Sequence, residues 1–152
     1  MFKVNKLTDY ATVVLISIAR SHVLRSTQQI SEKTGIPLPT VAKLMKSLNR
    51  AGLVKSQRGA SGGYSLGRIP AAITLADVIQ AVEGPIALTA CADTSDEHCH
   101  IQSVCPVQGR WNRVNSAVRA ALSEVTLADM VADINTFGIP PAAPAAPVAL
   151  AE

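Results

Sequence analysis

The chain has 152 residues and a formal net charge of +3, with 48% apolar and only 3% aromatic residues. This length suits one domain, or one small domain with an extension, and so few aromatic residues favour packed helices over a β-sandwich. The apolar run at residues 13–19 is too short to cross a membrane, so we expect no membrane partner. Because no export signal is recognisable and three cysteines lie close together, we expect a cytoplasmic protein.

Charge is distributed unevenly along the chain. Residues 1–70 carry eleven Lys and Arg and two acidic residues, a balance of +9, whereas residues 71–152 carry three Arg and nine acidic residues, a balance of −6. A basic half joined to an acidic half indicates that the first half binds a polyanion. A solvated basic surface without a partner is the alternative.

Apolar residues near the N-terminus recur at steps of three and four and predict a first helix over residues 7–18, which Thr8 can cap. A second helix begins where Ser26 and Gln29 can form a capping box, and Gly35 supplies its left-handed end. A third helix follows within a few residues and has a buried stripe. The stripe consists of Val41, Leu44, Met45 and Leu48. Two helices joined by a tight turn that contains glycine are a helix-turn-helix candidate.

Two short strands, residues 53–57 and 64–66, follow the third helix, with a glycine-rich loop between them. This order predicts a mostly α fold: a winged helix-turn-helix with a small β-wing. Its DNA contacts are expected on the polar face of the third helix and in the loop, where donors can reach phosphates and base edges. These residues are Thr40, Lys43, Ser47 and Arg50 on the helix, with Arg58 and Gly62 in the loop. A protein-interaction module with its polar face in water is the alternative.

A fourth helix at "TLADVIQAVEG" has Thr74 and Asp77 as start signals and Gly84 as its stop. Farther on, apolar residues alternate at steps of four and three over about two and a half heptads, which predicts a long C-terminal dimerisation helix. The heptad positions are Val107, Trp111, Val114, Val118, Ala121 and Val125. Packing on the chain's own core is the alternative to pairing with a second copy. "TLADMVADI" then reuses the capping chemistry of the fourth helix.

These patterns divide the chain into three regions. Residues 1–70 form the winged helix-turn-helix, residues 71–137 hold the cysteine loop and the dimerisation helix, and residues 138–152 are a Pro/Ala-rich tail whose composition predicts disorder.

All three cysteines lie in one segment, with seven residues between Cys91 and Cys99 and five between Cys99 and Cys105. Structural zinc sites usually place their ligands in closer pairs, whereas wider loops and soft thiolates suit an iron–sulfur cluster. Three thiolates leave one coordination position, for which His98, His100 or a residue from elsewhere in the chain is a candidate. A zinc site and a thiol switch without metal are the alternatives.

Four motifs together are similar to one known family. They are "KLTDYA", "AGLVKSQRGASGGYSL", "TLADVIQAVEG" and the cysteine triplet. From about Lys3 to Val131 the chain resembles the iron–sulfur-responsive winged-helix regulators of bacteria, the group that contains IscR and NsrR. Within that group, "LTDYATVVL" looks closest to the branch that regulates the SUF iron–sulfur assembly operon.

The resemblance implies a homodimeric transcription regulator that holds a 2Fe–2S or 4Fe–4S cluster on Cys91, Cys99 and Cys105. It also implies that the long C-terminal helix makes the dimer, and that the third helix and the wing read a palindromic double-stranded DNA operator. In the nitric-oxide sensors of this group, an aspartate at the start of the first helix can complete the partner subunit's cluster. Asp9 occupies that place here; the alternative is that Asp9 serves only as an acidic residue in the first turn, where it favours the helix dipole.

Two positions depart from the pattern of the IscR type. A histidine ligand three residues after the last cysteine is replaced by Gln108, so the fourth ligand is expected to be Asp9, His98 or His100. A glutamate of the recognition helix is replaced by Ala42, so a different base preference is expected.

We therefore predict a dimeric repressor of SUF-type genes that senses iron–sulfur, redox or nitric oxide status. Because no catalytic motif or phosphate-cradling loop is recognisable, we expect neither an enzyme nor a small-molecule substrate. Two alternatives remain open: a zinc-stabilised winged-helix regulator without sensing, and an interaction protein or iron–sulfur carrier that does not bind DNA.

Overall fold

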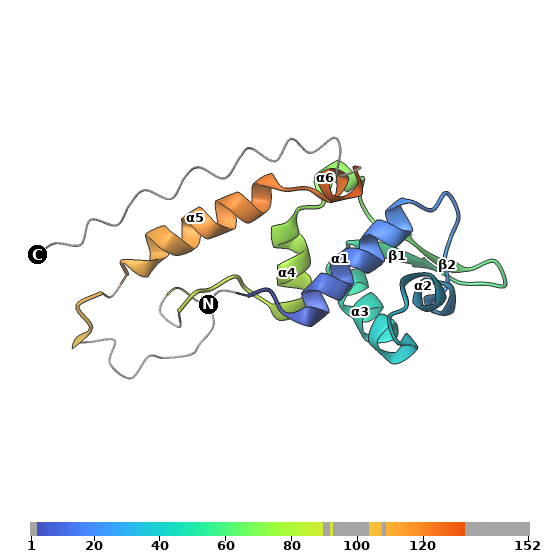
Figure 1. The fold of residues 1–152 in the computed structure, drawn as a ribbon, viewed down its shortest axis with the longest axis horizontal. Helices are drawn as coiled ribbons and strands as arrows, with labels where there is room; N and C mark the ends of the chain where they lie inside the picture. Colours follow the sequence, from blue (N-terminus) through green and yellow to red (C-terminus); the bar gives the residue numbers. More distant parts are fainter. Residues whose placement is uncertain (1–2, 90–91, 93–103, 108, 133–152) are drawn as a thin grey trace, which may run out of the picture.

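A computed structural model describes residues 3–89, 92, 104–107 and 109–132 (Figure 1). This part of the chain is mostly helical and has one small antiparallel sheet, as the sequence predicts. In chain order its elements are α1 (Lys6–Ala19), α2 (Thr27–Thr34), α3 (Leu38–Arg50), β1 (Val54–Gln57), β2 (Gly63–Leu66), η1 (Pro70–Ala72), α4 (Leu75–Glu83), α5 (Trp111–Glu124) and α6 (Leu127–Val131). The predicted tail, residues 138–152, lies outside the described residues, and none of the described helices is long and apolar enough to span a membrane.

Helix α1 runs through the core and buries the apolar face that the sequence predicts. Its cap differs from the prediction, because the side chain of Asn5 accepts a hydrogen bond from the Leu7 backbone N–H at 3.0 Å. Thr8 lies three residues after Asn5, already inside the helix, and its hydroxyl donates instead to the carboxylate of Glu83 on α4. The prediction that Thr8 caps this helix is therefore wrong.

The two helices of the helix-turn-helix have the predicted ends. Ser26 and Gln29 form the capping box at the start of α2, and Gly35 ends this helix with a left-handed φ of 72°. Because only glycine adopts that conformation without strain, the turn into α3 is fixed by this residue. The predicted stripe of α3, residues 41, 44, 45 and 48, is fully buried against α1 and α2.

The wing is an antiparallel pair in which Val54 faces Leu66 and Gln57 faces Gly63. It is anchored to the body by a bridge between Tyr64 and Arg25, whose backbone groups exchange hydrogen bonds of 2.8 and 3.2 Å. A Cβ atom added to Gly63 would lie 2.8 Å from the backbone of Arg25. This close approach requires glycine at residue 63.

The two "TLAD" segments contact each other. Each forms a capping box, Thr74 with Asp77 at the start of α4 and Thr126 with Asp129 at the start of α6. The segments also pair as an isolated antiparallel bridge: the Leu75 N–H donates to the Val125 carbonyl at 2.9 Å, and the Leu127 N–H donates to the Ile73 carbonyl at 2.7 Å. The reuse of capping chemistry is thus confirmed, and the bridge fastens the C-terminal end of α5 to the start of α4. We call this pairing the clasp.

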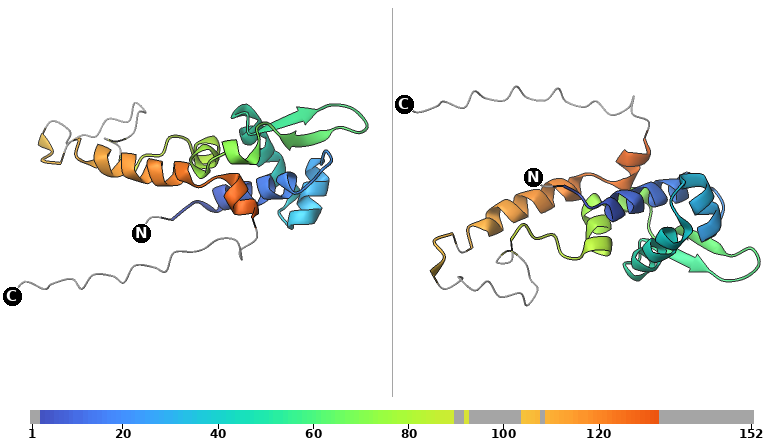
Figure 2. Two further views of the ribbon diagram at one scale, coloured as in Figure 1. Left: turned by 90° about the horizontal axis from the view of Figure 1, so that it is seen from above. Right: turned by 60° about the horizontal axis from the view of Figure 1, so that its bottom comes forward.

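Helix α5 extends from the body on the side away from the wing (Figures 1 and 2). Val107 precedes this helix, and Trp111 and Val114 are 39% and 46% exposed. Of the remaining heptad positions, Ala121 is exposed and Val118 and Val125 are half-buried. The heptad face therefore lies mostly outside the core formed by the described residues.

That core includes Ile73, Val78 and Leu127 together with the buried residues of α1, α2 and α3. Residues on both sides of position 70 thus pack together, and the division of the chain at residues 70 and 137 stays a prediction.

Candidate functional site

The outer face of α3 carries a row of basic side chains. Lys43 and Arg50 are exposed, as expected for DNA contacts, whereas Thr40 and Ser47 are half-buried and lie together at one edge of this face. Lys46 is also exposed and lies three residues after Lys43 and four before Arg50, so the three cations form one ridge. We call Lys43, Lys46 and Arg50 the basic ridge.

Lys46 was not among the residues predicted to contact DNA. It belongs to the basic residues counted in the first half of the chain, and its position opposite the stripe of Leu44, Met45 and Leu48 could have identified it. The prediction placed the polar face nearer to Thr40 and Ser47, whose side chains are half-buried.

The wing places Arg58 beside the start of α2. Arg58 is exposed, and a groove of about 450 Å³ separates the wing from the first residues of α2. The groove is lined by Ser26, Thr27, Ser56, Gln57, Arg58, Gly59, Gly62, Gly63 and Tyr64. At Gly62 a Cβ atom would collide with the Gln57 carbonyl, so only glycine fits. Hydroxyl, amide and guanidinium donors therefore surround this groove.

The electrostatics of this surface are dominated by cations. Glu32 is the single acidic residue between positions 10 and 76 of the sequence. Within the described part of the chain, the one ion pair joins Arg68 and Asp77 at 3.5 Å, and it lies outside the basic ridge and the wing. The charges of the basic ridge and of Arg58 are therefore not neutralised by described acidic side chains.

The cysteine segment is described only in part. Cys105 is a free, half-buried thiol, whereas Cys91, Cys99, His98, His100 and Gln108 lie outside the described residues. Asp9 is exposed on the first turn of α1. Among the described residues no group of three or more His, Cys, Asp or Glu could hold a metal ion, so the predicted ligand set stays a prediction.

Asn115 holds the segment that leads into the cysteine loop. Its side-chain amide donates to the Ile86 carbonyl at 3.0 Å, and its side-chain oxygen accepts from the Leu88 N–H at 3.1 Å. Asn115 is 5% exposed. We call residues 84–88 the stem, because Cys91 follows Leu88 by three residues. The heptad pattern gave no signal for this contact, because Asn115 is separated from its two partners by 27 and 29 positions in the sequence.

The start of the stem is also linked to α1. Glu83, the last residue of α4, accepts hydrogen bonds from the hydroxyl of Thr8 and, at 3.3 Å, from the N–H of Asn5. Thr8 is only 2% exposed. One carboxylate thus satisfies two donors at the start of α1 and fixes that helix to the end of α4.

Comparison with known proteins identifies several relatives. The chain is 39% identical over 107 residues to ORF2, a helix-turn-helix-type protein of Azotobacter vinelandii. The aligned region covers 70% of this chain and 64% of the relative. The chain thus spans less than two thirds of that relative's length. It is also 30% identical over 131 residues to the regulator NsrR of Bacillus licheniformis, which covers 85% of this chain and 92% of NsrR.

Solved structures with the same fold include CymR (YrzC), the global cysteine regulator of B. subtilis, with a TM-score of 0.66 and 32% identity over 86% of this chain and 97% of CymR. They also include IscR of T. potens, with a TM-score of 0.62 and 29% identity over 86% of each chain. A family model, Rrf2, described as "Iron-dependent Transcriptional regulator", matches residues 4–133. These matches confirm the resemblance seen in the sequence: the chain belongs to the Rrf2 family of iron-dependent transcriptional regulators.

Proposed function

We propose that this chain is a homodimeric DNA-binding repressor of SUF-type iron–sulfur assembly genes, acting in the cytoplasm and controlled by a cluster on its cysteine segment. The observation that carries the DNA-binding part is the basic ridge on α3. Lys43, Lys46 and Arg50 project from the face opposite the buried stripe, and no described acidic side chain neutralises them.

In this proposal α3 enters the major groove, which is about 12 Å wide and accommodates one helix. The basic ridge binds phosphates along the groove, while Thr40 and Ser47, together at one edge of the same face, offer hydroxyls to base edges or phosphates. Arg58 at the wing reaches the adjacent minor groove, and Gly62 lets the wing backbone approach the duplex.

Dimerisation is proposed through α5. The one fully buried side chain that α5 contributes to the described structure is the amide of Asn115, whereas Trp111 and Val114 are exposed. Trp111 lies one turn before Asn115 on the same side of α5, so the exposed apolar surface begins beside the contact with the stem and needs an apolar partner of its own. A second copy of α5 supplies that partner and places two α3 helices on the two halves of a palindrome.

The cysteine segment fits an iron–sulfur cluster by the chemistry of its donors. Cys91, Cys99 and Cys105 would provide soft thiolates, and Cys105 is a free thiol. Asp9, His98 or His100 would complete the ligand set; of these, Asp9 is exposed on α1. When bound, the cluster would supply iron centres whose ligation responds to iron supply, oxidants or nitric oxide.

Anaerobic purification tests the cluster. We expect a brown protein with visible absorption and stoichiometric iron and sulfide, and a Cys105→Ala variant that is colourless. A colourless wild-type protein with one zinc per chain would contradict the cluster and would support a zinc-stabilised regulator without sensing.

A duplex-binding titration over a salt series tests the DNA-binding part separately. We expect the affinity to fall steeply as salt rises, through release of counterions from the phosphates. If the wild-type protein shows no salt-sensitive duplex binding and Arg58→Ala changes nothing, an interaction protein or iron–sulfur carrier is the better description.

A further inference from the structure

We propose that Asn115 is the positioning residue through which the cysteine segment controls α5. This inference rests on the proposed function, because it assumes that the cysteine segment has two states and that α5 sets the arrangement of two chains. The inference is that the side chain of Asn115 couples the state of the cysteine segment to the position of α5.

The hydrogen bonds of Asn115 fix one register of the stem. An amide side chain presents one donor and one acceptor next to each other. Here the donor meets the Ile86 carbonyl and the acceptor meets the Leu88 N–H, two residues farther along the stem. A shift of the stem by one residue would remove both of these groups from Asn115. The contact therefore distinguishes one stem position from its neighbours, which apolar packing alone does not.

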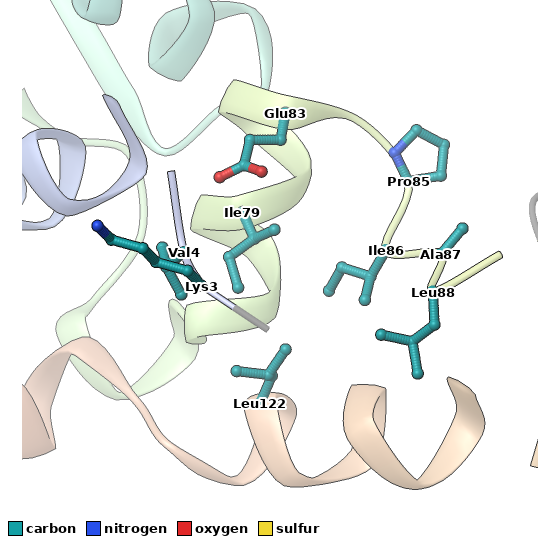
Figure 3. Close-up of a pocket in the computed structure, with 9 residues that line it drawn as sticks. All are labelled: Lys3, Val4, Ile79, Glu83, Pro85, Ile86, Ala87, Leu88 and Leu122. Atoms are coloured by element: carbon teal, nitrogen blue, oxygen red, sulfur yellow. The ribbon is translucent and has the colours of Figure 1, made fainter. Parts of the chain in front are cut away.

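The apolar packing beneath the stem is incomplete (Figure 3). A cavity of about 90 Å³ lies between the stem, α4 and α5, and the side chains of Ile79, Leu88 and Leu122 point into it from these three elements. The carboxylate of Glu83 lies at another side of the cavity and binds the start of α1. The stem is therefore held both by the buried side chain of Ile86 and by the two hydrogen bonds of Asn115, and of these only the hydrogen bonds are directional.

The clasp defines how a movement of the stem would reach α5. Leu75 and Leu127 fasten the C-terminal end of α5 to the start of α4 by backbone hydrogen bonds. Asn115 fastens the N-terminal half of α5 to the stem, beyond the other end of α4. A displaced stem would therefore tilt the N-terminal half of α5 about the clasp. Trp111 and Val114 lie on that half, so the tilt would change how two chains pair.

The experiment measures how strongly the cluster changes the affinity for DNA, and it does not depend on the stability of the fold. The operator probe is a duplex selected from a random-sequence pool by the wild-type protein. Its dissociation constant is measured, without oxygen and at one salt concentration, for cluster-loaded and cluster-free protein. The ratio of the two constants is compared among wild type, Asn115→Ala, Asn115→Asp and the matched control Asn112→Ala. Asn112 is an exposed asparagine on the same helix.

We expect the ratio of the two dissociation constants to differ from one in the wild-type protein. In Asn115→Ala the ratio should move toward one by a factor of at least about five, because typical allosteric couplings change an affinity by about fivefold or more. Asn115→Asp keeps the acceptor for Leu88 but sets a buried carboxylate oxygen against the Ile86 carbonyl, so its ratio should be as close to one as that of Asn115→Ala. Asn112→Ala should retain the wild-type ratio. A folded Asn115→Ala protein with the wild-type ratio overturns the inference while the proposed function stands.

Hydrogen exchange on the wild-type protein gives a second measurement that does not depend on the folding of a variant. The peptide containing Leu88 and the peptides of α5 should change protection together when the cluster is removed. A change in the stem without a change in α5 overturns the inference. A wild-type protein whose two forms bind the duplex equally overturns the proposed sensing, and the role of Asn115 falls with it.

Discussion

At the scale of single residues, the core determines which side chains of α3 are available to a ligand. Because Val41, Leu44, Met45 and Leu48 are buried, the helical period places residues 43, 46 and 50 on the opposite side. None of these three cations has a described ion-pair partner, so their charges are available to phosphates.

Lys46 provides the sharpest test of this face, because only the structure identified it. We expect Lys46→Ala to weaken binding similarly for all duplex sequences and to reduce the slope of log affinity against log salt by about one. Titrations by fluorescence anisotropy at several salt concentrations measure both quantities. Lys3→Ala, which removes the same charge far along the chain from α3, should leave the slope unchanged; an equal loss in both variants would show a general charge effect.

Thr8 and Thr12 differ in what their buried hydroxyls join. The Thr8 hydroxyl binds Glu83 on another helix, whereas the Thr12 hydroxyl donates at 3.1 Å to the Thr8 carbonyl within α1. We therefore expect Thr8→Val to lower the free energy of unfolding by about 1 kcal/mol and Thr12→Val to lower it by less. Urea denaturation followed by circular dichroism measures both. The reverse order would mean that the link between α1 and α4 contributes little.

At the scale of elements, the capping boxes and the clasp determine where α4, α5 and α6 begin and end. The boxes are local, since each joins residues three positions apart, but the clasp joins segments about fifty positions apart. Because the clasp uses backbone groups, it depends on both N-caps keeping their extended conformation.

The cap of α6 gives a prediction on pH. Hydrogen bonds from the Thr126 hydroxyl and then from its backbone N–H hold the pKa of Asp129 below its ordinary value of 3.8. Because the carboxyl pKa is lower in the folded state, the ionised carboxylate stabilises the fold at pH values above the ordinary pKa. This contribution is lost as the pH falls through the lower pKa of the folded state. We expect NMR titration to show Asp129 below 3.8 in wild type and closer to 3.8 in Thr126→Ala. An unchanged titration would mean that the cap does not hold this carboxylate.

Local patterns in the sequence predicted the elements well. The pairs Ser26/Gln29 and Thr74/Asp77, and Gly35 after α2, mark helix ends because capping acts within one turn. The cap of α1 was misplaced because Asn5 and Thr8 are both residue types that cap helices, and the period of the apolar residues does not fix the first turn.

Contacts between distant segments were not predictable in this way. The sequence gives no signal for the role of Asn115, because its partners Ile86 and Leu88 are brought to it only by the path of the folded chain. The clasp was missed for the same reason. The repeated "TLAD" letters indicate the same capping chemistry twice but do not say that the two segments pair.

At the scale of the whole molecule, α3 and the wing lie toward one end and α5 extends toward the other (Figure 1). DNA reading and pairing of chains are thus assigned to different surfaces. Trp111 and Val114 of α5 are exposed in the single chain, and Trp111 is the only tryptophan in the sequence. Its fluorescence can therefore report whether that face is covered.

Val114 tests the pairing surface. We expect Val114→Asp to weaken the dimer by more than about tenfold, because burying a carboxylate in an apolar interface costs well above 1.4 kcal/mol. Sedimentation velocity over a concentration series measures the dimer, and a red shift of the Trp111 emission should accompany dissociation. Asn112→Asp places the same charge on another side of α5 and should leave the dimer intact. Equal effects of both changes would argue against this face as the interface.

The central claim is that two chains present two copies of the α3 and wing surface to one duplex. A hydroxyl-radical footprint of the wild-type protein on its selected duplex tests this most directly. We predict two protected half-sites related by a two-fold axis, with centres about 34 Å or a multiple of that apart, as for other dimeric helix-turn-helix proteins. A single unsymmetrical footprint, or no protection at concentrations where the protein is dimeric, would contradict the account.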